Sequence, residues 1–162
     1  MRSLVGLALL ASAMPAAAKD SLGVFGNWGA FRDPGAARCY AIALPEPSRA
    51  QRDYRAYASV GTWPRRGVRG QVHFRLSRKL AAEPGIALAV GGQRFTLVGG
   101  GGDAWARDRA MDAAIVAAMR SAGALSISAR DARGRRFTDR YALAGAATAL
   151  DAAAVGCARM RR

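Results

Sequence analysis

The stretch RGQVHFRLSRKL, residues 69–80, has the clearest secondary-structure pattern in the chain. In it Val72, Phe74 and Leu76 alternate with polar side chains. A period of two places the apolar and polar residues on opposite faces of a β-strand. The stretch therefore predicts a strand in a sheet that has one buried face and one face in water.

Other segments carry similar strand signals, bounded by glycine, proline or aspartate. The further predicted strands are residues 28–31, 39–43, 54–63, 86–90, 95–97, 125–129 and 137–143. Turn signals lie between several of them, at residues 33–35, 91–92 and 131–135. Short glycine-containing turns typically join antiparallel neighbours, so the predicted sheets are mainly antiparallel.

Two segments have the period of a helix instead. Asp108 is a suitable N-cap for a helix that reaches about Ser121, and Asp112 falls outside the apolar stripe of that helix. An alanine-rich helix is predicted over residues 146–158, with Cys157 on its buried side. The whole pattern predicts a mainly β protein, an antiparallel β-sandwich or barrel-like sheet with two short α-helices.

The N-terminus has the features of a cleaved export signal. Arg2 precedes an uncharged apolar run over residues 4–14, and small residues follow at 16–18. The run is too short to span a bilayer, so residues 1–18 are predicted to be removed. Residues 19–162 then form a single domain that works in the periplasm or at the extracellular face, with outer-membrane association as a further option. No transmembrane segment is predicted in this mature chain.

The chain is strongly basic, with a formal net charge of +14. Such a charge is typical of proteins with anionic partners such as nucleic acid, anionic lipid or lipopolysaccharide. The alternative is a composition bias spread over a solvated surface, because nearly every basic residue is arginine and alanine and glycine are abundant. Export argues against nucleic acid as the partner and favours an envelope component.

The two cysteines, Cys39 and Cys157, lie near opposite ends of the chain. In an oxidising compartment, two thiols in one domain favour a disulfide, which here would close most of the chain. Two buried free thiols are the alternative. The wide spacing excludes a CxxC redox motif and a four-ligand zinc site.

The strongest candidate binding site is a group of arginines beside an aromatic residue. Its predicted members, within WPRRGVR at 63–69 and on the next wet strand face, are Trp63, Arg65, Arg66, Arg69, Arg75 and Arg78. Arginine suits phosphate and carboxylate groups, and tryptophan suits a membrane interface or a sugar ring. A solvated hairpin loop with a packed tryptophan is the alternative interpretation.

Signals for catalysis are weak. The single histidine, His73, is predicted on the wet face of its strand, with no local nucleophile motif. A glycosidase pair of Asp103 and Asp108 would form only in space, and a helix cap is the simpler role for Asp108. The glycine run 99–102 lacks the residues of a phosphate-binding loop and is predicted to be a flexible loop. We therefore predict no catalytic residue, no metal ligand and no cofactor.

Parts of the chain resemble the invasion-associated locus B (IalB) family of alphaproteobacterial exported proteins. The resemblance is best over residues 113–120, 125–128 and 141–150, which follow the family's order of helix, hairpin and closing glycine-containing segment. Trp28 and Cys39 also match the family's tryptophan and the second cysteine of its hairpin pair, whereas Arg32 or Asp33 stands at the first.

The resemblance implies an exported, invasion-associated protein in the periplasm or against the outer membrane, and it carries no catalytic residues. It also implies that the family's local hairpin disulfide is lost here, so that a Cys39–Cys157 bridge would replace it.

Three functions stay open. The first is a non-enzymatic protein that binds an envelope component or a protein partner. The second is an envelope glycan hydrolase that uses carboxylates gathered by the fold, and the third is a purely structural role through protein contacts.

Overall fold

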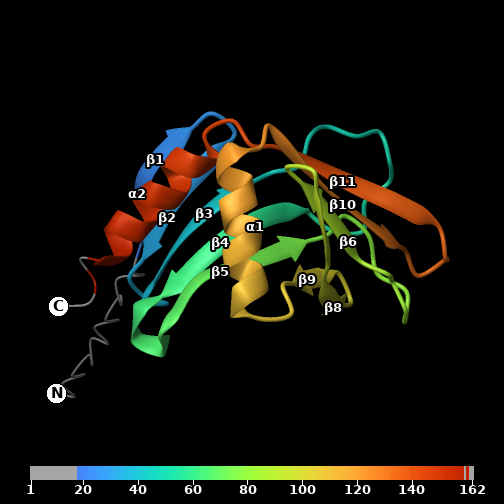
Figure 1. The fold of residues 1–162 in the computed structure, drawn as a ribbon, viewed down its shortest axis with the longest axis horizontal. Coiled ribbons are helices and arrows are strands. Elements are labelled where there is room, and N and C mark those ends of the chain that lie inside the picture. Colours follow the sequence, from blue (N-terminus) through green and yellow to red (C-terminus); the bar gives the residue numbers. More distant parts are fainter. Residues whose placement is uncertain (1–17, 159, 161–162) are drawn as a thin grey trace, which may run out of the picture.

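A computed structural model of the chain describes residues 18–158 and residue 160 (Figure 1). Most of the predicted export signal, residues 1–17, lies outside the described residues. The described part contains two antiparallel sheets and two α-helices, which confirms the predicted mainly β fold. Neither helix has both the length and the apolar character that crossing a membrane would require.

The large sheet has the strand order β1-β2-β3-β4-β5-β9-β8. Its strands are Asp20–Phe25 (β1), Trp28–Asp33 (β2), Arg38–Ala43 (β3), Tyr57–Trp63 (β4), Val68–Arg75 (β5), Val98–Gly100 (β8) and Asp103–Trp105 (β9). The turn predicted at residues 33–35 joins β2 to β3, and a short 3-10 helix, η1 (Pro64–Arg66), joins β4 to β5.

The small sheet has the order β11-β10-β6-β7. Its strands are Ala87–Val90 (β6), Gln93–Thr96 (β7), Ala124–Arg130 (β10) and Arg136–Ala142 (β11). The structure confirms the two predicted turns of this sheet: Gly91 and Gly92, both at positive φ, join β6 to β7, and residues 131–135 join β10 to β11. The sheet thus consists of two hairpins that pair through β6 and β10.

Both helices lie close to their predicted positions. Helix α1 spans Arg109–Ser121, and the Asp108 carboxylate accepts a hydrogen bond from the Met111 backbone N–H at 2.8 Å. Helix α2 spans Ala146–Ala158 and packs on β1, β2 and β3. The predicted disulfide joins Cys39 on β3 to Cys157 on α2, with a Cα–Cα separation of 5.6 Å, and both side chains are buried.

The core lies between the two sheets and beneath the helices. Val72, Phe74 and Leu76 are fully buried, as the alternation predicts. Trp28 is also fully buried, and its indole N–H donates to the carbonyl of Ala142 on β11 at 3.0 Å. This hydrogen bond ties the large sheet to the last strand of the small one.

Two strand predictions need correction. The stretch 69–80 leaves the ladder after Arg75, because the Leu76 and Leu80 N–H groups donate to Gly102 and Gly101 instead. The prediction also missed β1 altogether. This strand lies at the edge of the sheet, and its pairing with β2 is interrupted by an irregularity beside Gly23, so its sequence lacks a clean alternation.

The prediction of a flexible loop at residues 99–102 is wrong. These glycines form the β8–β9 hairpin, and β9 pairs with β5 from His73 to Arg75. A Cβ atom at Gly99 would lie 2.1 Å from the carbonyl oxygen of Asp103, and one at Gly102 would lie 2.4 Å from the Tyr54 ring. Glycine therefore allows the close approach of backbone at residue 99 and of the Tyr54 ring at residue 102, rather than providing mobility.

The predicted position of Asp112 also needs correction, because this residue is buried and does not lie on the solvated side of α1. Strand β9 pairs with β5 only as far as His73, so the next N–H along, that of Val72, lacks a strand partner on this side. The Asp112 carboxylate accepts it at 2.8 Å. Helix α1 thus completes the hydrogen bonding at a place where the sheet stops.

We expect Asp112→Ala to lower the free energy of unfolding by about 1–3 kcal/mol, because it leaves the buried Val72 N–H unpaired. Asp112→Asn keeps an acceptor oxygen and should cost less. Urea unfolding of the three proteins measures both effects. Equal stability of wild type and Asp112→Ala would contradict the role of this hydrogen bond.

The pH dependence supplies a second readout for the same position. Burial raises the pKa of Asp112 above its ordinary 3.8, and the Val72 hydrogen bond opposes this only in part. The folded state then holds a proton that the unfolded state has lost, so this group's contribution to stability falls as pH rises from about 4 to the raised pKa. The stability of wild type relative to Asp112→Asn should therefore decrease over this pH range. A difference in stability that does not change with pH would contradict the raised pKa of Asp112.

Candidate functional site

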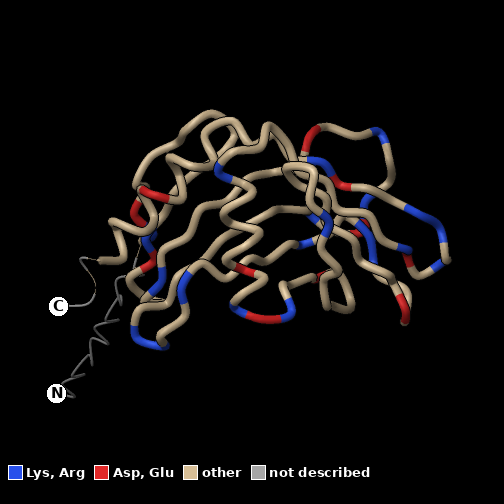
Figure 2. Tube along the Cα trace, viewed as in Figure 1, with Lys and Arg blue, Asp and Glu red and all other residues tan. Residues whose placement is uncertain are grey.

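The predicted arginine cluster is divided by the fold, and its first part lies at one hairpin tip. Arg65 and Arg66 belong to η1, and Arg69 is the second residue of β5; all three are exposed. Figure 2 shows this tip, at the lower left, in blue with no red on it. None of the ion pairs among the described residues includes any of these three arginines.

The other members of the cluster are elsewhere and are engaged. Arg75 lies six residues farther along β5, roughly 20 Å from Arg69 at the rise of a strand, and its guanidinium pairs with Asp103. The Arg78 side chain is only 11% exposed and contacts Asp131 at 2.8 Å. Trp63 is half-buried, and its ring packs over Gly61. This resembles the alternative interpretation, in which the tryptophan of the hairpin is packed.

Arg69 borders an apolar groove that the sequence did not reveal. The groove has a volume of about 360 Å³ and runs between the β4–β5 hairpin and the two helices. Its lining consists of Val60, Thr62, Arg69 and Gly70 from the hairpin, Val116 and Arg120 from α1, and Leu150, Ala153, Ala154, Cys157 and Ala158 from α2. The volume falls in the range of roughly 300–1,000 Å³ that small-molecule pockets occupy.

The groove is apolar inside and cationic at its border. Arg120 pairs with Asp151 at 2.7 Å, so this pair adds no net charge, whereas Arg69 has no carboxylate partner among the described residues. Small alanine side chains of α2 leave room between the helices and the hairpin. The arrangement suits a ligand with an apolar body and an anionic end.

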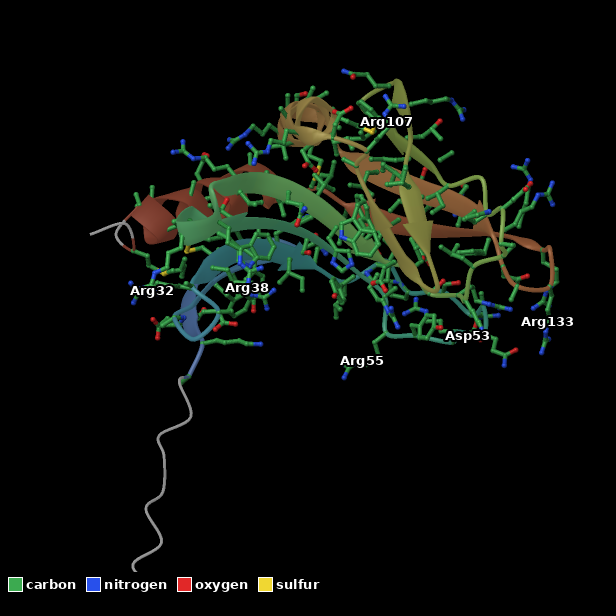
Figure 3. The ribbon with its side chains drawn as sticks, turned by 90° about the horizontal axis from the view of Figure 1, so that it is seen from below. Arg32, Arg38, Asp53, Arg55, Arg107 and Arg133 are labelled. Atoms are coloured by element: carbon green, nitrogen blue, oxygen red, sulfur yellow. A yellow bond between two sulfur atoms is a disulfide. The ribbon has the colours of Figure 1, made fainter. Side chains whose placement is uncertain are left out.

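A second group of functional side chains lies on the opposite face of the large sheet, which we call the outer face. Here the strand register aligns Ser59, His73 and Trp105 in one row across β4, β5 and β9. It aligns Tyr57, Arg75 and Asp103 in the next row. Figure 3 shows α1 above the large sheet, on the side away from this face.

His73 is the centre of this group and differs from its prediction as a solvated surface residue. Its side chain is 21% exposed, and Nε2 lies 3.0 Å from Oδ1 of Asp103. The Trp105 ring stacks on the imidazole with centroids 5.0 Å apart and planes inclined by 18°. Tyr57 meets the imidazole edge-on at 5.5 Å. The fold thus packs the only histidine between two aromatic rings.

Arg75 completes the group on its other side. It pairs with the second oxygen of Asp103, and its guanidinium lies 3.9 Å from the centroid of the Tyr54 ring. Burial raises the pKa of the Tyr57 hydroxyl, and the charge of Asp103 adds to that shift. The Tyr57 hydroxyl therefore stays protonated at neutral pH and is a hydrogen-bond donor. Sequence reasoning missed Trp105 because it follows the glycine run that we predicted to be a loop.

The candidate carboxylate pair of the hydrolase hypothesis is not assembled as a free pair. Asp103 is bound by His73 and Arg75, and Asp108 serves as the cap of α1, the simpler role predicted for it. One surface pocket does have two carboxylates in its lining, Asp131 and Asp139. These accept hydrogen bonds from backbone N–H groups, among them those of Arg133 and Ser77, so both hold the fold together.

The fold and the sites thus define a two-sheet antiparallel β protein with an apolar groove and a separate aromatic face. Comparisons of the chain with models of protein families, with curated proteins and with solved structures return no match. The resemblance to the invasion-associated locus B family therefore stays a prediction, and function must be argued from the two sites.

Proposed function

We propose that this protein is an exported, non-enzymatic binder of an anionic amphiphile of the cell envelope. The ligand would place an acyl chain in the groove between the β4–β5 hairpin and the helices. Its phosphate or carboxylate group would face Arg69, with Arg65 and Arg66 of the hairpin tip nearby. The observation that carries the proposal is the apolar groove bordered by Arg69, which pairs with no carboxylate among the described residues.

The energetics favour a charged end at this place. A guanidinium binds phosphate and carboxylate oxygens through charge-assisted hydrogen bonds, each of which contributes about 1.5–3 kcal/mol. The strongly basic composition, with a formal net charge of +14 before removal of the export signal, adds long-range attraction for an anionic ligand or an anionic membrane surface. Because the groove is lined mainly by apolar side chains, a small inorganic anion would gain less from it than an amphiphile would.

The export part of the proposal rests on two features. The N-terminal segment has the pattern of a cleaved signal. The Cys39–Cys157 disulfide is of a kind that persists in oxidising compartments such as the periplasm. A place in the invasion-associated locus B family, in the periplasm or at the outer membrane, is part of the same proposal.

Titration calorimetry with dodecyl phosphate, kept below its critical micelle concentration, tests the ligand class. Arg69→Gln should weaken binding about 10- to 100-fold, the equivalent of one lost charge-assisted hydrogen bond. Ala154→Phe should abolish binding, because the exposed Ala154 lines the groove and a phenyl ring would occupy it. Binding should also weaken as salt is raised.

Controls separate the groove from general basicity. Arg94 is exposed on β7 of the small sheet and forms no ion pair with another described residue, so Arg94→Gln removes the same charge away from the groove. It should leave affinity for dodecyl phosphate unchanged. Two results would contradict a specific site for an anionic amphiphile. One is an equal loss of affinity for dodecyl phosphate in Arg69→Gln and Arg94→Gln, and the other is binding of the neutral dodecyl maltoside as tightly as dodecyl phosphate.

A further inference from the structure

The outer face of the large sheet has features that the groove does not use. Its central side chains come from the neighbouring strands β5 and β9 and are each only partly exposed: 21% for His73, 26% for Asp103, 29% for Arg75 and 37% for Trp105. Both helices pack on the opposite face of the sheet. The buried residues of these strands, such as Val72 and Ala104, point to that opposite face. The aromatic rings here therefore meet solvent without being part of the core.

Trp105 is held in a fixed orientation. One face of its ring stacks on the imidazole of His73, and Asp103 fixes that imidazole through a hydrogen bond of 3.0 Å. Arg75 in turn fixes the other oxygen of Asp103. An indole oriented in this way, and exposed over a third of its surface, is a preorganised stacking surface that loses little conformational entropy on binding.

The polar groups around the indole are balanced in charge. The carboxylate of Asp103 lies between His73 and Arg75, so the basic side chain here is already neutralised. A phosphodiester chain would meet that carboxylate and be repelled, whereas a nucleic-acid site needs unpaired basic groups along its stacking rings. Neutral hydroxyl groups both donate and accept hydrogen bonds, and the set of carboxylate, guanidinium and phenol offers partners for both roles.

From this juxtaposition we infer that the outer face is a binding site for a neutral saccharide chain. The apolar face of one pyranose ring stacks on Trp105, and hydroxyls of that ring or its neighbour reach Asp103, Arg75 and the Tyr57 hydroxyl. The rows of the sheet place Arg75, Asp103 and Trp105 side by side along β5 and β9, with Tyr57 beside Arg75 on β4, which suits an extended chain lying flat on the strands. This site is separate from the groove and does not depend on the amphiphile proposal.

Titrations of the protein with cellohexaose and with chitohexaose, followed by tryptophan fluorescence and calorimetry, test the inference. We expect at least one of the two to bind with a Kd of 5 mM or tighter. Trp105→Ala should weaken that binding at least 10-fold, and Asp103→Asn should weaken it while the protein stays folded. Arg94→Gln and Arg69→Gln should bind the same saccharide as wild type does.

Four results would overturn the inference. They are the absence of binding of both saccharides at 10 mM, saccharide binding that Trp105→Ala leaves unchanged, binding of oligo(dT) that Trp105→Ala abolishes, and a dimer in sedimentation that Trp105→Ala converts to monomer. Far-UV circular dichroism and thermal unfolding establish that each variant is folded. Since dodecyl phosphate binding depends on Arg69 and saccharide binding on Trp105, either proposal can fail without the other.

Discussion

The double substitution Cys39→Ala/Cys157→Ala is expected to lower the free energy of unfolding by about 3–5 kcal/mol. The disulfide closes a loop with a sequence separation of 118 residues. Chain entropy alone assigns a loop of that size about 4–5 kcal/mol, because the crosslink restricts the unfolded chain. It also fixes α2, the last helix, to β3 in the first half of the chain.

Urea unfolding of the oxidised protein, the reduced protein and the double variant measures this effect. Reduced wild type keeps both sulfur atoms, so its difference from the variant isolates the small cost of removing buried Sγ atoms. We expect reduced wild type and the variant to unfold at similar urea concentrations, both well below the oxidised protein. A reduced protein as stable as the oxidised one would show that the crosslink contributes nothing.

Trp28→Ala is expected to cost about 3–5 kcal/mol of unfolding free energy. The Trp28 side chain is fully buried, and its indole N–H donates to the carbonyl of Ala142 at 3.0 Å. Its loss creates a large cavity and leaves a carbonyl acceptor without this partner at the junction of the two sheets. Thermal and urea unfolding report the change.

Trp105→Ala is the matched control, because it removes the same side chain from a partly exposed position. We expect it to cost about 1 kcal/mol or less, which is the size of an aromatic pair interaction. If the two variants lose similar amounts of unfolding free energy, Trp28 does not stabilise the junction between the two sheets more than a partly exposed tryptophan would. The same control establishes that the saccharide-binding test uses a folded protein.

Local patterns in the sequence predict most of the fold. The alternation of Val72, Phe74 and Leu76 places one face of β5 in the core, and the glycine pair at residues 91–92 sets a hairpin. The cap at Asp108 and the alanine-rich run at residues 146–158 position both helices. Each of these features depends on neighbouring residues only, so it can be read without knowledge of the tertiary structure.

The sites were harder to predict, because their parts come from distant segments. Of the predicted arginine cluster, Arg65, Arg66 and Arg69 lie together at one hairpin tip. The fold separates them from Arg75 and Arg78, which it pairs with carboxylates. Ion pairs such as Arg78 with Asp131 link residues far apart in the chain, and no local spacing encodes them. The same holds for Asp112, whose burial depends on where β9 ends.

By itself the sequence determined the β-rich architecture, the two helices, the pairing favoured for the two cysteines and the basic character of one hairpin. The architecture, the helices and the basic hairpin follow from periodicity, turn chemistry and local composition, which act over a few residues. The cysteine pairing follows from the presence of only two cysteines in a chain with an export signal. Only the tertiary structure decided which arginines form no ion pair with another described residue, where the groove lies and that Trp105 stacks on His73. Those outcomes depend on strand register and on the packing of α1 and α2 against the sheet, and both are set by contacts between segments that are remote in sequence.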